Sequence, residues 1–387
     1  MKILTIFIDM IRANRLSTFN AKVKEDTPLD VAFKKLGGTV YKNCFSPGPD
    51  TPRAIATFLT GIEPYNNGCN TRLKWPQFFL KKDQKTIFDL FLDENYAVNC
   101  FSSPKERDNG LFPEHVALMD IHNQDYNMKT YLENIQLKEK HFVFVSIPDY
   151  HWAFDDYGYS TYGEKKSYVI TKNVYDIVFE SFDKNDFDHI FIFSDHGFKF
   201  NAERVLEDKR MMLNTDRTNC ILIHRAKGQE GLRVNNKLCS LADFFPTYQF
   251  LLKKEVDFGF PFFMEQARNF IVLEDHMNFS PMINQNIELW ALVTKDKIYI
   301  RTLENAITIT REHYEISRKV DMKFDKLLIE NSSFGIYIDE YEKIFRYKKN
   351  ILSKNVYMNG RIRESKRKLY KYFFVLLDIV KIKVIND

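Results

Sequence analysis

The feature that most constrains the fold is an alternation of short β-branched and aromatic runs with longer amphipathic stretches. Five runs have the composition of strands: residues 3–8, 97–101, 142–147, 189–193 and 220–224. Five stretches have helical periodicity: residues 30–36, 52–60, 86–94, 168–182 and 240–252. Such alternation is typical of parallel strands joined by crossover helices. Residues 142–147 are nearly all apolar, as expected of a strand covered on both faces. We therefore predict a doubly wound α/β sheet.

The pattern changes after about residue 265. Residues 289–294 and 298–302 are apolar and flank a Lys295-Asp296-Lys297 turn, which predicts an antiparallel hairpin, and residues 335–339 could add a strand. We predict a catalytic α/β domain over residues 1–265 and a smaller α+β subdomain over residues 266–387. The subdomain would end in a basic amphipathic helix, residues 361–383, either packed or solvated, or in contact with a membrane surface.

Charge and cysteine content narrow the class of protein. The 56 basic and 52 acidic side chains give a net charge of +4, too even for an obligate nucleic-acid binder. The 5 cysteines lack paired spacing, which argues against a disulfide framework and favours a reducing compartment. No apolar run has the length of a signal peptide or a membrane span. We expect a cytoplasmic protein, with a peripheral membrane location as the alternative and no prediction of oligomeric state.

Three segments carry residues suited to chemistry. Asp9 follows the first predicted strand, at the sheet edge where open α/β sheets bind ligands, although it could equally cap a helix. Thr51 and Pro52 suit the N-cap and first position of a helix that Gly61 would end. Such a helix start attracts anions, and Arg53 could grip one in a bidentate manner. An ordinary capped helix is the alternative.

The third segment, residues 189–197, is a strand that ends in Asp195, His196 and Gly197. This places a carboxylate and an imidazole at the same sheet edge as Asp9. Two carboxylates and one imidazole suit zinc or manganese better than a metal selected by thiolates.

Taken together and in this order, these segments resemble the alkaline phosphatase superfamily, and within it the sulfatase-like branch. Residues 6–17 look like its first strand with a D-x-x-R-x-x-x-L-S continuation, and residues 51–68 like its nucleophile helix and T-G-x-x-P-x-x-x-G turn. Residues 191–197 resemble its metal strand, and residues 241–247 its L-x-D-x-x-P-T helix. The resemblance covers most of the first 255 residues. It implies an alkaline phosphatase-like three-layer α/β/α sandwich with a mostly parallel central sheet.

Two departures from the sulfatase pattern bear on the chemistry. Sulfatases oxidise a cysteine or serine in a C/S-x-P-x-R pattern to formylglycine, but Thr51 stands at the aligned position and cannot be oxidised in that way. Met10 stands where sulfatases tend to have a second acid. What remains resembles phosphodiesterases and phosphoethanolamine or phosphoglycerol transferases with a threonine nucleophile. The resemblance implies one divalent metal, zinc or manganese rather than calcium, held by Asp9, Thr51, Asp195 and His196.

In such relatives Thr51 would attack phosphorus and form a covalent phosphothreonine, which water or an alcohol then resolves. His151 lies in a stretch that resembles a D-x-H-x-P motif, with Ala153 in place of the proline. His151 could protonate the leaving group or bind the phosphoryl oxygens, and Asp149 could orient it. A second metal at Asp149 and His151 is disfavoured, because no histidine lies between His196 and His224.

Lys105 could bind the substrate anion, or it could be an ordinary surface lysine. The sequence thus predicts a metal-dependent hydrolase or transferase that acts on a phosphate ester or phosphodiester, for example on an envelope or capsule glycan precursor. Two alternatives stay open: a sulfatase that uses unmodified threonine, and an inactive relative that binds an ester.

Overall fold

The computed structural model describes residues 1–69, 84–102, 128–198, 212–256, 258–278, 286–311 and 315–334, with residues 80, 116, 118–119 and 338–339. Residues 1–335 form one compact unit and residues 336–387 a second. Lys105 and the helix predicted at 361–383 lie outside the described residues. Of the strand predicted at 335–339, only residues 338–339 are described, and they are helical. The division predicted at residue 265 stays a prediction.

In the described part of the chain, the central sheet has nine strands in the order β4-β3-β5-β1-β6-β8-β2-β7, with β9 paired to β2. Its first half is parallel throughout and comprises β4 (Leu118–Met119), β3 (Ala97–Phe101), β5 (His141–Ile147), β1 (Lys2–Ile8) and β6 (His189–Phe193). The four longer strands are the ones predicted from their apolar runs. Their carboxyl ends share one edge, so the residues after β1, β5 and β6 are brought together.

The second half of the sheet differs from the prediction. It comprises β8 (Leu222–Ala226), β2 (Gly38–Phe45), β7 (Asn219–Cys220) and β9 (Leu232–Ser240). The strand predicted at 220–224 is split in two, and both parts run antiparallel to their neighbours. The split falls at Ile221, whose N–H donates to the Ser194 hydroxyl rather than continuing a strand ladder. The prediction of a parallel strand there was wrong.

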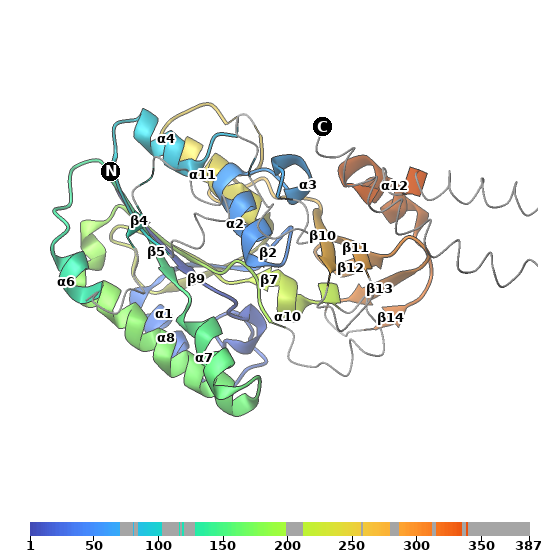
Figure 1. Ribbon diagram of the computed structural model, residues 1–387, viewed down its shortest axis with the longest axis horizontal. Helices are drawn as coiled ribbons and strands as arrows, with labels where there is room; N and C mark the ends of the chain where they lie inside the picture. Colours follow the sequence, from blue (N-terminus) through green and yellow to red (C-terminus); the bar gives the residue numbers. More distant parts are fainter. Residues whose placement is uncertain are drawn as a thin grey trace, which may run out of the picture. The chain divides into compact units, whose positions relative to one another are not determined.

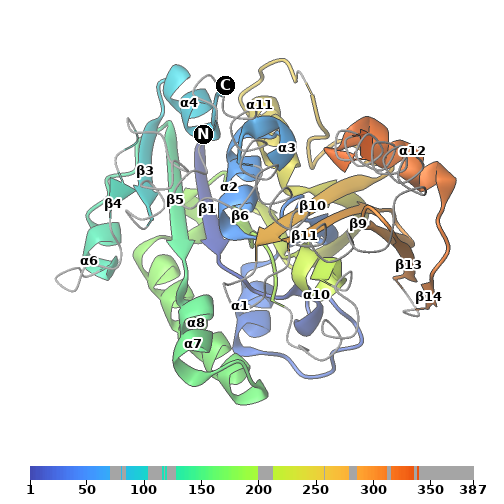
Figure 2. The same cartoon turned by 45° about the vertical axis from the view of Figure 1, so that its right-hand side comes forward.

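Helices cover both faces of this sheet (Figures 1 and 2). One face carries α1 (Pro28–Leu36), α6 (Met128–Glu133), α7 (Asp149–Tyr157) and α8 (Thr161–Ser181). The other carries α2 (Thr51–Thr60), α3 (Pro64–Asn67), α4 (Ile87–Asp93) and α11 (Phe244–Leu251). Alternate side chains of β1 enter the two cores: Ile3 and Phe7 on the α2 side, Leu4 and Ile6 on the α8 side. The predicted three-layer sandwich is confirmed.

A five-stranded antiparallel sheet follows in chain order: β10 (Ile271–Asn278), β11 (Asn286–Val293), β12 (Lys297–Arg301), β13 (Ala306–Thr310) and β14 (Ile316–Ser317). The predicted hairpin is the β11–β12 pair. Helix α12 (Met322–Asn331) packs on this sheet, and beyond it Ser333 accepts a hydrogen bond from the Trp290 indole at 2.8 Å. The short helix α10 (Thr215–Thr218) precedes β7. Among the described residues, we find no helix with the length and apolar character needed to cross a membrane.

Candidate active site

Asp9 stands at the carboxyl end of β1, at the centre of the sheet. The chain turns sharply behind it because Met10 adopts a left-handed backbone conformation, with φ of 64°. The carboxylate of Asp9 accepts hydrogen bonds from two elements: the Thr51 hydroxyl at 3.4 Å and Nδ1 of His151 at 2.8 Å. The residue at the cap of the next helical turn is Arg12. Of the two predicted roles for Asp9, helix capping is therefore excluded.

Thr51 is the first residue of α2, and the prediction that it caps this helix was wrong. The N-cap is Asp50, whose side chain accepts the Arg53 N–H at 3.2 Å. The Thr51 hydroxyl is therefore not needed by the helix and is turned toward Asp9. The far end of α2 is as predicted, because Gly61 adopts the left-handed conformation with φ of 71°.

Asp195 and His196 follow β6 and bring the third segment to the same edge. One carboxylate oxygen of Asp195 accepts the N–H groups of Met10 and His196, at 3.0 and 2.7 Å. The other oxygen, Oδ2, is buried and has no hydrogen-bond partner among the described residues. Nδ1 of His196 lies 2.7 Å from the Gly197 carbonyl, to which it donates, so Nε2 is the ring nitrogen left to bind a ligand. This Nε2 is 3.3 Å from Asp195 Oδ2. A metal ion bound at this place would be a ligand partner for both atoms.

These residues fit a divalent metal ion. One ligand atom each from Asp9, Asp195 and His196 lie within 4.8 Å of one another, and no other group of this kind occurs in the described part of the chain. The hydrogen bond from His196 to a backbone carbonyl is the support that metal-bound histidines usually have. The donor set of two carboxylates and one imidazole suits zinc or manganese, as predicted from the sequence.

The charged groups of Asp9, His151 and Asp195 shift one another's pKa values. Burial opposes ionisation of Asp9, but the hydrogen bond and charge of His151 outweigh burial and lower the pKa of Asp9. Burial likewise opposes the imidazolium of His151, yet the Asp9 contact raises the pKa of His151 to about 9. Burial and the neighbouring Asp9 charge raise the pKa of Asp195 to about 6. His151 is thus protonated at neutral pH.

His151 lies on α7, a helix that the sequence did not predict. Asp155 lies one turn further along α7, and Tyr159 follows the end of the helix. Nε2 of His151 is 3.8 Å from the Asp155 carboxylate, which accepts the Tyr159 hydroxyl at 2.5 Å. The Tyr159 ring stacks on Phe198, directly after the Asp195–Gly197 turn, with centroids 4.6 Å apart. The i, i+4 spacing of His151 and Asp155 is the signal that could have found Asp155. Asp149 is half-buried, and burial raises its pKa.

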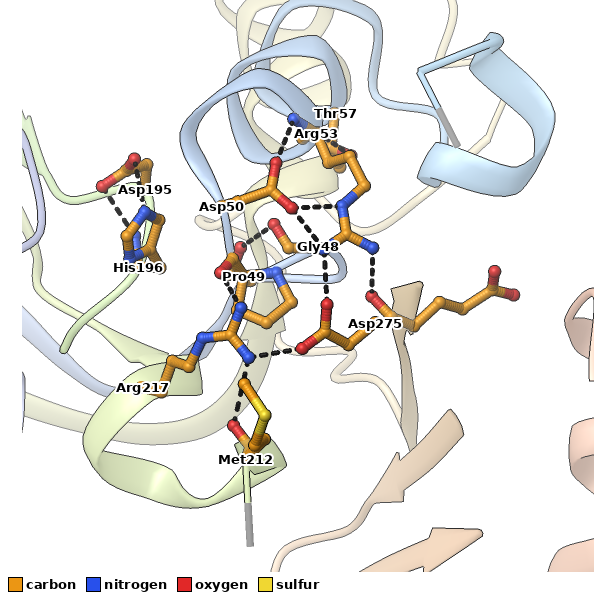
Figure 3. A network of polar contacts seen from close by, with 12 residues as sticks. Gly48, Pro49, Asp50, Arg53, Thr57, Asp195, His196, Met212, Arg217 and Asp275 are labelled. Atoms are coloured by element: carbon orange, nitrogen blue, oxygen red, sulfur yellow. Dashed lines mark hydrogen bonds and ion pairs between the residues drawn. The ribbon is translucent and has the colours of Figure 1, made fainter. Parts of the chain in front are cut away.

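Arg53 does not face the Asp9 cluster. Its guanidinium is fully buried and bonded to the Asp50 carboxylate, the Glu274 carbonyl at 2.9 Å and the Asp275 carboxylate at 2.8 Å (Figure 3). Burial would lower the pKa of Arg53, but the two carboxylates raise it. The sequence suggested that Arg53 binds a substrate anion in a bidentate manner, but these contacts already occupy its guanidinium.

Comparison with solved structures shows the class of fold. The chain is similar to a 2-O GAG sulfatase, with 14% identity, a TM-score of 0.60, and 95% of this chain and 93% of that chain covered. It is similar to the phosphonate monoester hydrolase of Silicibacter pomeroyi, with 12% identity, a TM-score of 0.58, and 93% and 96% covered. A third neighbour is an alkaline phosphatase superfamily protein of Vibrio parahaemolyticus, with 14% identity, a TM-score of 0.58, and 83% of each chain covered.

No protein-family model and no curated protein sequence matches the chain. The protein therefore has the fold of the alkaline phosphatase superfamily in its sulfatase-like form, the fold that its sequence motifs predicted. Identities of 12–14% carry the fold and not the activity.

Proposed function

We propose that the protein is a metal-dependent hydrolase or transferase that cleaves a phosphate ester or phosphodiester through a covalent phosphothreonine at Thr51. The observation that carries the proposal is the hydroxyl of Thr51, which the helix does not use and which is hydrogen-bonded to Asp9 at the edge of the metal-ligand group. A protein that only binds an ester has no need of a hydroxyl in this place. Asp9, Asp195 and His196 would hold one divalent ion, with Thr51 beside it.

When bound, that ion would supply positive charge to stabilise the phosphoryl group and to acidify the nucleophile. The residues of the chain account for the proton transfers. The Thr51 oxygen forms a bond to phosphorus, and its proton passes to Asp9, the acceptor of its hydrogen bond. The bond from phosphorus to the leaving alcohol breaks, and His151 donates a proton to that oxygen from Nε2. Water or an acceptor alcohol then releases the phosphoryl group from Thr51.

A second observation supports a ring-bearing leaving group, such as a glycan. Four aromatic side chains that follow His151 closely in the sequence are each 44% exposed or more: Trp152, Tyr157, Tyr159 and Tyr162. The rings of Tyr157 and Tyr162 pack edge to face with centroids 6.3 Å apart, and the Tyr159 hydroxyl donates to Asp155 beside His151. Exposed aromatic rings gathered in one place mark binding surfaces, because their flat faces pack against ligand rings. Two of the structural neighbours bear on this point: one is a GAG sulfatase, and another is a protein crystallised with a neocarrahexaose.

Hydrolysis of three nitrophenyl esters tests the reaction: the phosphate, the bis-phosphate and the sulfate. Thr51→Ala should lower turnover of the phosphate esters about 1,000-fold or more, because the nucleophile is removed. Thr57→Ala is the matched control, since Thr57 lies on the same helix and its hydroxyl donates to the Arg53 carbonyl at 2.9 Å. Mass spectrometry of quenched enzyme should detect one phosphate on Thr51. Turnover of the sulfate ester alone would favour a sulfatase with unmodified threonine, and full activity of Thr51→Ala would refute the nucleophile.

A further inference from the structure

A second buried polar cluster lies beside the nucleophile. It consists of Asp50, Arg53, Arg217 and Asp275, two acids and two bases, all less than a tenth exposed. Asp275 is its centre: one carboxylate oxygen accepts Arg53 Nη2 at 2.8 Å, and the other accepts Arg217 Nη1 (Figure 3). We call this group the arginine–aspartate cluster. Its charges balance, so it needs no ion from outside.

One arm of the cluster holds the segment that carries Thr51. Arg53, two residues after Thr51, binds the Asp50 carboxylate that caps α2. Strand β10 supports the same segment through its backbone, because the Glu274 N–H donates to the Pro47 carbonyl at 2.8 Å and the Glu274 carbonyl accepts from Arg53. Strand β10 is therefore hydrogen-bonded to the nucleophile segment both before Thr51, at Pro47, and after it, at Arg53.

The other arm reaches the turn that carries Asp195 and His196. Arg217 donates to the Pro49 carbonyl at 2.8 Å, and its own backbone carbonyl accepts the Gly197 N–H at 2.8 Å. The approach is close: a Cβ on Gly197 would lie 2.1 Å from the Asp216 carbonyl oxygen, so only glycine fits. Arg217 thus ties the nucleophile segment to the metal-ligand turn.

We infer that Asp275 is a positioning residue, which acts from the antiparallel sheet through Arg53 and Arg217 to set the distance between Thr51 and the Asp195–His196 turn. Asp275 touches no reacting atom in this scheme. Without its carboxylate the two guanidiniums face each other with no shared counter-charge, and the two segments are free to separate. The catalytic part of this inference rests on the proposed function; the structural part does not.

The test compares Asp275→Asn with Asp325→Asn in the full chain. Asp325 is a matched control, since it is a buried aspartate of the same region that is bonded to Arg301 and Tyr299 and to neither segment of the site. Asp275→Asn should lower kcat about 100-fold, as a displacement of about 1 Å does, with KM changed less than about 3-fold. Asp325→Asn should leave both within about 3-fold of wild type.

Amide hydrogen exchange provides a readout that does not depend on activity. Asp275→Asn should speed exchange in peptides that contain Gly197 and Arg53, whereas Asp325→Asn should speed it only around β12 and α12. Unchanged exchange in both site segments would overturn the inference, whatever the enzyme hydrolyses. If wild type cleaves none of the esters but exchange responds as expected, the proposed function fails and the positioning role stands.

The double variant Asp275→Asn/Arg217→Gln covers the case in which the single variant does not fold. It leaves Asp50 and Arg53 as a balanced pair but removes the bridge between the two segments. It should fold, and its kcat should stay about as low as that of the single variant. Recovery of wild-type kcat would show that Asp275 only balances charge, and would overturn the inference.

Discussion

Two polar clusters lie on either side of Thr51, one buried and one partly exposed, and they differ in how many of their polar atoms have hydrogen-bond partners within the protein. In the arginine–aspartate cluster, both oxygens of Asp275 are bonded and two acids face two bases. In the cluster of Asp9, Thr51, His151, Asp195 and His196, which we propose binds a metal, one oxygen of Asp195 is buried without a hydrogen-bond partner among the described residues. A buried polar group without a partner is unfavourable unless something else binds it. The satisfied cluster serves the fold, and the unsatisfied one marks the site.

The first test of this comparison is the stability of Asp275→Asn. Removing one partner of a buried ion pair leaves an uncompensated charge, so the free energy of unfolding should fall by about 3–5 kcal/mol. Urea denaturation at pH 7 measures it. Asp26→Asn, which removes an exposed ion pair with Lys34, is the control and should leave the midpoint unchanged. A loss no larger than the control would mean that the cluster adds nothing to the fold.

The second test is the response of stability to a metal. Zinc or manganese at about 100 times its Kd should raise the free energy of unfolding by about 2.7 kcal/mol, because only the folded chain has the site. Asp195→Asn should abolish this gain, and Asp325→Asn should keep it. Equal gains in wild type and Asp195→Asn would place the ion elsewhere in the protein.

The third test concerns two histidines away from the Asp9 edge of the sheet, His189 and His224. Nδ1 of His189 lies 3.0 Å from Nε2 of His224, and the two nitrogens share a hydrogen bond. This hydrogen bond requires an unprotonated acceptor nitrogen. Burial lowers the pKa of His224 to about 3, and burial also lowers the pKa of His189. In the unfolded chain both titrate near 6.5, so below that pH only the unfolded state takes up protons and stability falls.

For His224 alone the loss between pH 6.5 and pH 5 should be about 1.6 kcal/mol, because the slope approaches its limit of about 1.4 kcal/mol per pH unit only below pH 6. Denaturation at pH 7, 6 and 5 should therefore show a shallower decline for His224→Gln than for wild type. Parallel declines would mean that His224 is already protonated in the folded protein.

The elements that could be predicted from sequence are those whose burial is visible in their own residues. Strands β1, β3, β5 and β6 were predicted because strands covered by helices on both faces are almost continuously apolar. Strand β9 was missed because its first part is partly exposed and polar, with Arg233, Asn235 and Asn236. Helix α7 was missed because Asp149–Tyr157 mixes acidic and aromatic residues without a clear apolar stripe.

The meeting of Asp9, Thr51, Asp195 and His196 at one sheet edge could be predicted, because each follows a strand or begins a helix there, and local patterns place them; their role as metal ligands stays a prediction. The contacts of Arg53 could not be predicted, because its partner Asp275 lies 222 residues further along the chain. Its position in the first turn of α2 suggested an anion ligand, whereas a distant carboxylate already occupies its guanidinium. A local sequence pattern can indicate that a residue is placed to bind a ligand. It cannot show that a residue distant in sequence already forms the hydrogen bonds of that side chain.

The smallest expected change in the free energy of unfolding is that of Asp195→Asn, and it best distinguishes the two clusters. Asp195→Asn makes the same chemical change as Asp275→Asn, but in metal-free protein it should leave the free energy of unfolding equal to wild type or higher by about 1 kcal/mol. The asparagine Oδ1 can still accept the N–H groups of Met10 and His196, and its amide can donate toward Asp9. Burial raises the pKa of Asp195 to about 6, so at pH 7 the folded state holds this carboxylate ionised at a disadvantage that asparagine removes.

Asp195→Ala is the control for that substitution, because it removes the acceptor of both N–H groups and should be destabilising. The informative quantity is the difference between the two Asp→Asn variants in metal-free buffer at pH 7, measured by urea denaturation. If Asp195→Asn destabilises the protein as much as Asp275→Asn does, Asp195 is already satisfied by the chain and the case for a metal at this edge is lost. If the two variants move in opposite directions, the Asp195 carboxylate is unsatisfied in the metal-free protein, as expected of a ligand whose ion is absent.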